Sequence, residues 1–178
     1  MRKVLYIMGL LNDDDIAWMA KAGRRRTLEP GSTIISQGVH VPDLFIVLDG
    51  MVEVDVRGVG VVATLASGEI IGEMSFVDKA PPSATVRAPA AATVLALDKR
   101  TMEARLASDT GFSSRFYKAL AIYLADRLRG ASGQPADDGL IADAMQADEL
   151  DEAVLDQVSM AGTRFKHMLR TLSGARAG

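Results

Sequence analysis

The sequence predicts a mainly β fold, an antiparallel sandwich or jelly roll with helices at both ends. Between about residues 24 and 98, short apolar stretches alternate with turn sequences such as Pro30-Gly31. Many short strands at near-regular spacing, with no helical pattern between them, are typical of a sandwich or jelly roll. Helical periodicity on both sides of this region adds flanking helices to the prediction.

At the N-terminal end, apolar residues recur at helical spacing, which predicts a helical segment over residues 3–22. Asn12 or Asp13 is placed to cap its second half. The acidic residues that follow have the sign that favours the N-terminal end of a helix dipole.

Within the β region, the strongest turn signal is Asp49-Gly50, between the apolar stretch LFIVL and the alternating stretch MVEVDV. A two-residue Asp-Gly loop between such stretches predicts a β-hairpin. Arg57-Gly58 closes the next predicted strand, and residues 92–97 form the last one.

Two amphipathic helices are predicted after the strands, separated by a linker at residues 131–139, ASGQPADDG. Apolar residues on one face of the first helix are Phe112, Phe116, Leu120, Tyr123, Leu124 and Leu128. A heptad-like stripe in the tail, residues 140–178, consists of Leu150, Val154, Val158, Ala161, Phe165, Met168 and Leu172. We therefore predict a domain over residues 1–130, a linker and a helical tail. The tail must either dock back on the domain or pair with another copy, and its heptad spacing favours a homodimer formed through the C-terminal helices.

Composition restricts the location, the partners and the chemistry. The net charge is −3, so no global basic field attracts nucleic acid or anionic lipid. The chain has no cysteine, and no apolar run approaches the roughly 18–20 residues of a membrane span, so we expect a cytoplasmic protein with no membrane partner. His40 and His167 lie far apart without a carboxylate cluster, so neither a metal site, a resident cofactor nor a catalytic centre is predicted.

Residues 68–86, GEIIGEMSFVDKAPPSATV, have the features of a phosphate-binding loop. Gly72 allows the backbone to approach a ligand that a Cβ would keep away. Glu73 can accept a hydrogen bond from a ribose hydroxyl, and residues 74–77 can form a helical turn whose free amides point at a phosphate.

This loop, and its place between an N-terminal helix, about eight short strands and a long helix, resembles the cyclic-nucleotide-binding domain family over residues 5–130. The stretch LFIVLDGMVEV is similar to the hydrophobic–Gly–Val hairpin of that family. The resemblance implies a phosphate-binding cassette at residues 72–85, with cyclic AMP or cyclic GMP as the ligand. Its candidate ligand-binding residues are Gly72, Glu73, Met74, Lys79, Ser83, Ala84 and Thr85.

One position departs from the family's pattern, because Pro82 stands where the phosphate-binding arginine is usual. Proline has neither a charge nor an N–H, so the side-chain and backbone donors are lost together. A charge-assisted hydrogen bond contributes about 1.5–3 kcal/mol, so we expect an affinity lowered roughly ten- to a hundredfold. Lys79 either replaces that charge or is a solvated loop lysine. Arg127 and Arg129 lie at the end of the long helix, and the resemblance implies that this helix can fold over the base of the ligand as a lid. The favoured interpretation is that the two cations complement the C-terminal end of the helix dipole.

Three functions are compatible with these observations. The first is a regulatory sensor module that binds a cyclic nucleotide and signals through its C-terminal helices. The second is a ligand-independent dimerisation scaffold, favoured by Pro82, in which Gly72 and Glu73 form only a structural turn. The third is a transcription regulator of the catabolite-activator type. Residues 131–178 are acidic and contain one heptad helix instead of a helix-turn-helix, so we expect no DNA partner. The intact Gly72, Glu73 and Ser83 favour the sensor.

Overall fold

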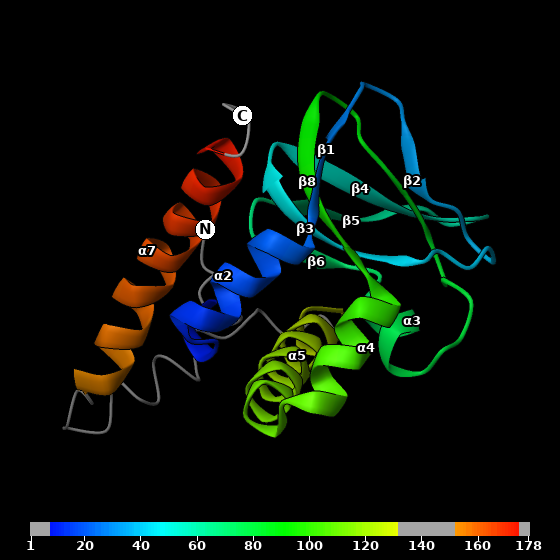
Figure 1. The fold of residues 1–178 in the computed structure, drawn as a ribbon. Coiled ribbons are helices and arrows are strands. Elements are labelled where there is room, and N and C mark those ends of the chain that lie inside the picture. The colour runs from blue at the N-terminus through cyan, green and yellow to red at the C-terminus, as the bar shows by residue number, and fades with distance from the viewer. Residues whose placement is uncertain (1–7, 132–151, 175–178) are drawn as a thin grey trace.

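The fold is that of a computed structural model, which describes residues 8–131 and 152–174. Within these residues, eight strands form two antiparallel sheets of four strands each, and neither sheet closes into a barrel. Figure 1 shows the sheets packed together on one side of the molecule and the helices gathered on the other. The predicted jelly-roll-like architecture with flanking helices is confirmed.

The first sheet has the strand order β1–β8–β3–β6. Its strands are β1 (Arg24–Leu28), β3 (Asp43–Asp49), β6 (Ile70–Ile71) and β8 (Ala92–Asp98). Alternate residues of β3 face opposite sides, so that Leu44 and Ile46 join the core under the helices while Phe45 and Val47 join the core between the sheets. Both faces of this sheet are therefore covered, which explains why its central strands are apolar throughout.

The second sheet has the order β2–β7–β4–β5. Its strands are β2 (Thr33–Ile35), β4 (Met51–Val56), β5 (Gly60–Ala66) and β7 (Thr85–Arg87). Only one face is covered, because Val52 and Val54 are buried whereas Val61 and Val62 are about half exposed. Strands β4 and β5 form a hairpin around Gly58, whose φ is +82°.

The predicted hairpin at Asp49-Gly50 is wrong. Strands β3 and β4 flank this turn but belong to different sheets, so the chain crosses from one sheet to the other at Gly50. Gly50 has a φ of +78°, and a Cβ there would lie 2.8 Å from the carbonyl oxygen of Ala91. The glycine thus permits a close crossing of two chain segments, which a local sequence pattern cannot distinguish from a hairpin turn.

Helices of the described residues flank the sheets. They are α2 (Asp13–Ala22), α3 (Glu73–Val77), α4 (Lys99–Ser108), α5 (Thr110–Ala131) and α7 (Glu152–Gly174). The predicted cap of α2 is confirmed at Asn12, which forms a reciprocal capping box with Asp15. None of the described helices is both long and apolar enough to span a bilayer.

Helix α5 packs its first half beneath the first sheet. Phe112, Phe116 and Tyr123 are almost completely buried, whereas Leu128 near the end of the helix is 70% exposed. The N-terminal part of α5 is also joined to α2 by an ion pair, in which Arg115 donates to both carboxylate oxygens of the buried Asp15 at 2.7 and 2.9 Å. The predicted apolar face is thus buried along most, but not all, of its length.

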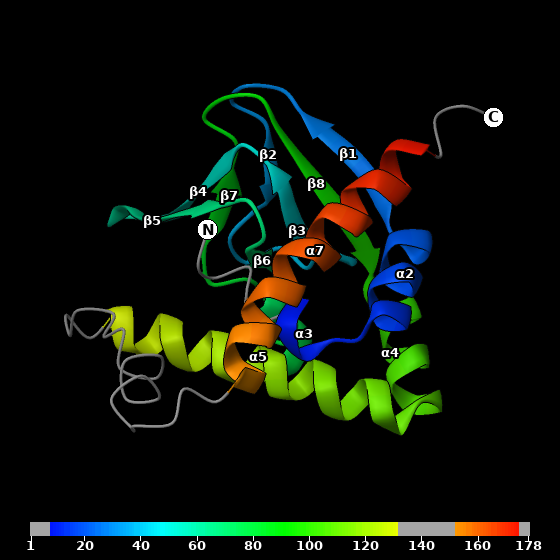
Figure 2. The ribbon, with the colours of Figure 1, turned by 90° about the vertical axis from the view of Figure 1, so that its left-hand side faces the viewer.

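Helix α7 lies beside α2 in the same chain (Figures 1 and 2). Ala161 and Met168 of the heptad-like stripe are fully buried, and Phe165 packs against the same core. Arg164 donates to Asp13 at 2.6 Å and to the carbonyl oxygen of Gly9 at 3.2 Å. The described part of the stripe therefore has an intramolecular partner.

Several predictions about the C-terminal region remain predictions. Leu150 and the proposed linker, apart from Ala131, lie outside the described residues, and the side chains of Val154 and Val158 lie in a part of α7 that is described only as backbone. The division into a domain, a linker and a tail is not tested, and neither is the homodimer.

Candidate functional site

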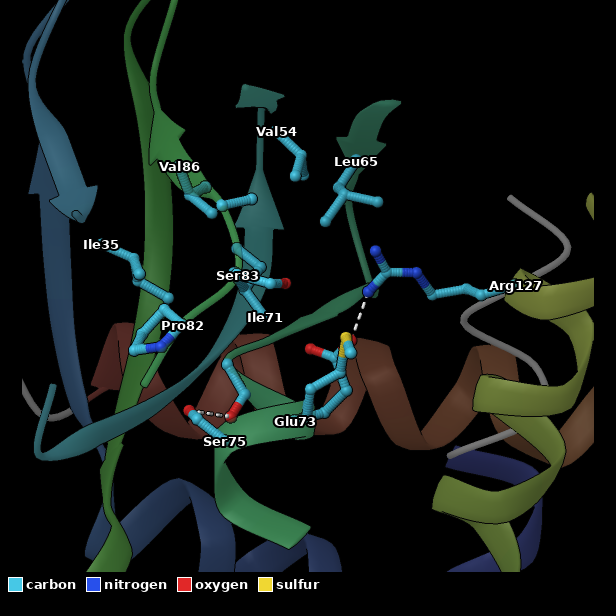
Figure 3. Close-up of a pocket in the computed structure, with 13 residues that line it drawn as sticks. Ile35, Val54, Leu65, Ile71, Glu73, Ser75, Pro82, Ser83, Val86 and Arg127 are labelled. Carbon is cyan, nitrogen blue, oxygen red and sulfur yellow. Dashed lines mark hydrogen bonds and ion pairs between the residues drawn. The ribbon is translucent and has the colours of Figure 1, made fainter. Parts of the chain in front are cut away.

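A small pocket lies between the second sheet, α3 and α5 (Figure 3). Its volume is about 60 Å³. One wall is apolar and is formed by Ile35, Val54, Leu65, Ile71 and Val86. The remaining lining residues come from the predicted cassette and from α5: Gly72, Glu73, Met74, Ser75, Pro82, Ser83, Ala84 and Arg127.

Gly72 sets the geometry of the cassette, because it ends the β6 segment and begins α3 with a φ of +85°. Its carbonyl oxygen accepts a hydrogen bond from the amide of Phe76 at 3.1 Å and from the hydroxyl of Ser75 at 3.2 Å. A Cβ here would meet only ordinary contacts at 3.5 Å. The position therefore requires glycine for its left-handed backbone and not for lack of space.

Glu73 is the acidic group of the pocket, and it is 3% exposed. Its carboxylate forms an ion pair with Arg127, which enters the pocket from α5. Burial raises the pKa of Glu73 above its ordinary value, and this effect outweighs the lowering by Arg127 and by the backbone amides of Glu73 and Gly72. A buried carboxylate with one cationic partner thus lies at the base of the pocket.

We expect Glu73→Gln to be at least as stable as the wild type at neutral pH. Because the pKa of Glu73 is raised in the folded state, folding favours the protonated carboxyl group. Proton uptake by Glu73 therefore stabilises the folded protein in acid, and this contribution is lost as the pH rises through the raised pKa. Glutamine keeps the shape and removes the cost of burying the charge, while Arg127, about a quarter exposed, remains accessible to water.

Urea unfolding of both proteins from acid pH to about pH 8 measures this effect. The stability difference in favour of Glu73→Gln should be smallest in acid and should increase with pH. A variant that loses stability relative to the wild type as the pH rises would show that the ion pair with Arg127 outweighs the cost of burial.

The other end of the cassette forms the wall opposite α5. Pro82, Ser83 and Ala84 line the pocket there. The carbonyl oxygen of Pro82 accepts a hydrogen bond from the amide of Gly38 at 2.8 Å, which fixes this part of the loop against the chain before β3. The backbone of the cassette is therefore anchored by a bond that does not depend on the side chain at position 82.

The structure does not bring two of the candidate residues into the pocket. Lys79 has a φ of +60°, and its ammonium group lies 4.9 Å from the centre of the Phe76 ring and pairs with Glu103 of α4. Thr85 accepts a hydrogen bond from the amide of Gln37 at 3.2 Å and does not line the pocket. Met74, by contrast, lines it and is about half exposed.

Arg127 lines the pocket but is not among the candidate ligand-binding residues predicted from the sequence. The interpretation as a cation at the end of a helix did not place it opposite Glu73, from which it is separated by 54 residues. It is the one cationic side chain among the residues that line this pocket. The available signal was its position one turn after Tyr123, where the apolar face of α5 gives way to a charged residue.

A match to a protein-family model identifies the family of the strand region. The cyclic nucleotide-binding domain model matches residues 25–109, which include all eight strands except the first residue of β1, as well as the whole of α3 and α4. Residues 25–109 belong to the cyclic nucleotide-binding domain family. All the residues that line the pocket except Arg127 lie in this matched segment.

Individual relatives agree with this assignment. The chain is 28% identical over 165 residues to the HTH-type transcriptional regulator Cmr of Mycobacterium tuberculosis, covering 89% of this chain and 66% of the relative. It is 32% identical over 97 residues to a cAMP-dependent protein kinase regulatory subunit of Eremothecium gossypii, covering 54% and 21%. The chain therefore spans just under two thirds of the first relative and about a fifth of the second.

A solved structure agrees in fold. A cyclic nucleotide-binding domain from Methylobacillus flagellatus superimposes with a TM-score of 0.65 and 21% identity, covering 73% of this chain and 79% of that one.

Among the described residues, no group of three or more His, Asp or Glu side chains is placed to bind a metal ion.

Proposed function

We propose that this chain is a regulatory module that binds a cyclic nucleotide, cyclic AMP or cyclic GMP, in the pocket between the cassette and α5. The observation that carries the proposal is the convergence of Gly72, Glu73 and Ser83 on one pocket of a cyclic nucleotide-binding domain. Glu73 would accept a hydrogen bond from the ribose, and Ser83 and Ala84 would donate to the cyclic phosphate. No catalytic step is assigned to the module.

The size of the pocket implies that ligand binding requires rearrangement. Ligand pockets usually have volumes of roughly 300–1,000 Å³, whereas this one has about 60 Å³. Arg127 extends from α5 into the pocket (Figure 3), and Met74 of α3 also lines it. A nucleotide would therefore displace side chains attached to α5 or α3, which links ligand binding to the position of these helices.

Signalling through the C-terminal helices is part of this proposal. Helix α5 contacts the cassette region at two points, since the Tyr123 hydroxyl donates to the carbonyl oxygen of Ile70 at 2.9 Å and Arg127 pairs with Glu73. A ligand bound at Glu73 would lie directly beside the second contact and change its strength. The free-energy difference between α5 with this contact and α5 without it would then depend on the ligand.

Calorimetric titration with cyclic AMP and cyclic GMP tests the proposal, with 5′-AMP as the non-cyclic control. We expect binding in the micromolar range or weaker, abolished by Glu73→Ala. We expect Pro82→Arg to tighten binding roughly ten- to a hundredfold, because it restores a charge-assisted hydrogen bond. The Pro82 carbonyl contact with Gly38 does not require proline, so the loop can keep its position.

Absence of binding by both the wild type and Pro82→Arg at millimolar nucleotide would overturn the proposal. The chain would then be better described as a ligand-independent scaffold, in which the Glu73–Arg127 pair closes an unused pocket. A role in transcription, as the name of the mycobacterial relative suggests for that protein, would need a DNA-binding element, and the absence of a DNA partner stays a prediction. The homodimer and the cytoplasmic location stay predictions as well.

A further inference from the structure

The cassette loop of this protein has no cation of its own that faces the pocket. Pro82 occupies the usual arginine position, and Lys79 is directed toward Glu103. We propose that Arg127, contributed by α5, supplies the positive charge that binds the ligand's phosphate in place of the missing loop arginine. This inference rests on the proposed function and names the residue that determines its affinity.

The position of Arg127 supports this assignment. In Figure 3 its side chain extends from α5 into the pocket, and the guanidinium lies between Leu65 and Glu73 on the side facing Ser83. It is 26% exposed, so most of its surface is already removed from water. The guanidinium carbon also lies 5.8 Å from the centre of the Tyr123 ring, which orients the side chain. A phosphate at the Ser83 wall would meet an oriented cation.

The pair with Glu73 leaves donors available on Arg127. A guanidinium has five N–H donors in a planar arrangement, and the contact with Glu73 is made through one of its terminal nitrogens. Arg127 can therefore bridge Glu73 and a phosphate without leaving the pocket. In this arrangement Glu73 orients the cation as well as facing the ribose.

The other cations near the cassette are engaged elsewhere. Arg87 pairs with Glu53 at 3.3 Å and with Asp55 at 3.7 Å on the exposed face of the second sheet. Lys99 does not line the pocket, and its ammonium group donates to the hydroxyl of Ser75, a lining residue, at 2.9 Å. Among the residues that the structure places around the pocket, Arg127 is therefore the cation best positioned for an anionic ligand.

The source of this cation has a consequence for signalling. A loop arginine would bind phosphate without involving α5, whereas Arg127 ties the phosphate directly to that helix. Ligand affinity then depends on where α5 lies, and by reciprocity the ligand stabilises the position of α5 that presents Arg127.

The test is a calorimetric comparison of the full chain and four variants with cyclic AMP and cyclic GMP. Arg127→Gln removes the charge, and Arg129→Gln is the matched control, an exposed arginine on the same helix. Pro82→Arg and the double variant Pro82→Arg/Arg127→Gln complete the set. Thermal unfolding of each variant confirms that it is folded.

We expect Arg127→Gln to weaken binding at least tenfold and Arg129→Gln to change it by less than about twofold. Pro82→Arg should restore binding in the Arg127→Gln background, because the loop then has its own cation. Wild-type binding that Arg127→Gln leaves unchanged or tightens would overturn this inference while leaving the proposed function intact. No binding by the wild type or by Pro82→Arg would overturn both.

Discussion

Replacing Phe116 by alanine is expected to lower the free energy of unfolding by about 3–5 kcal/mol. Phe116 is 1% exposed and lies in α5 between two other buried rings, with its ring centre 6.0 Å from that of Phe76 and 5.7 Å from that of Phe112. Truncation removes the contacts with these two buried rings and leaves a cavity that the surrounding sheet and helices cannot fully fill.

Urea unfolding measures this loss, with Tyr117→Ala as the control. Tyr117 is the next residue on α5 but is 47% exposed, so its truncation should cost less than about 1 kcal/mol. Because Phe76 belongs to α3, the Phe116→Ala variant should also hold the cassette less firmly. A loss equal to that of Tyr117→Ala would mean that α5 is not packed as the structure shows.

Replacing Arg115 by methionine is expected to lower the free energy of unfolding by roughly 2–3 kcal/mol. Asp15 is 1% exposed, and Arg115 supplies both of its charged hydrogen bonds from α5. Without Arg115, a buried carboxylate loses its cationic partner, which typically costs about 3–5 kcal/mol in a protein interior. The expected value is smaller, because Arg115 is 34% exposed and water already screens the pair in part.

Arg100→Gln is the matched control, since Arg100 is an exposed arginine on α4. Its replacement should change stability by no more than about 0.5 kcal/mol. If Arg115→Met is equally mild, then water reaches Asp15 once Arg115 is removed, and the pair does not fix α2 on α5.

The fold could be predicted because its evidence is local. Turn sequences, short apolar stretches and flanking helical periodicity each depend on neighbouring residues, and they identified the strands and the Asn12 cap. The error at Asp49-Gly50 has a physical cause, since an Asp-Gly turn with a positive φ can either return a strand to its neighbour or pass it to another sheet. Which of the two occurs depends on strand pairing with residues far along the chain, and no local pattern contains that information.

In the candidate site, too, the sequence predicts the residues that are close together in the chain but not their distant partners. Gly72, Glu73, Met74, Ser83 and Ala84 line one pocket in the structure because the cassette is a single continuous loop whose sequence pattern is nearly complete. The partners of its charges come from elsewhere. Arg127 of α5 forms an ion pair with Glu73. Lys79 has a left-handed backbone conformation and pairs with Glu103 of α4, so its side chain does not line the pocket. Charge pairing across tens of residues follows from packing, which the sequence pattern alone does not specify.

The first turn of α2 makes two contacts of unequal strength. Asp15 is buried against Arg115 of α5, whereas Asp13, which pairs with Arg164 of α7, is 78% exposed. Water screens this second pair through the exposed Asp13, although Arg164 itself is 13% exposed, so α7 depends mainly on the burial of residues such as Ala161 and Met168. We therefore expect a partial opening in which α7 detaches as a unit, while α2, α5 and the two sheets remain folded, to cost less free energy than global unfolding. Such an opening would expose apolar residues of α2 to solvent while the two sheets remain folded. The exposed apolar patch could then associate transiently with other molecules.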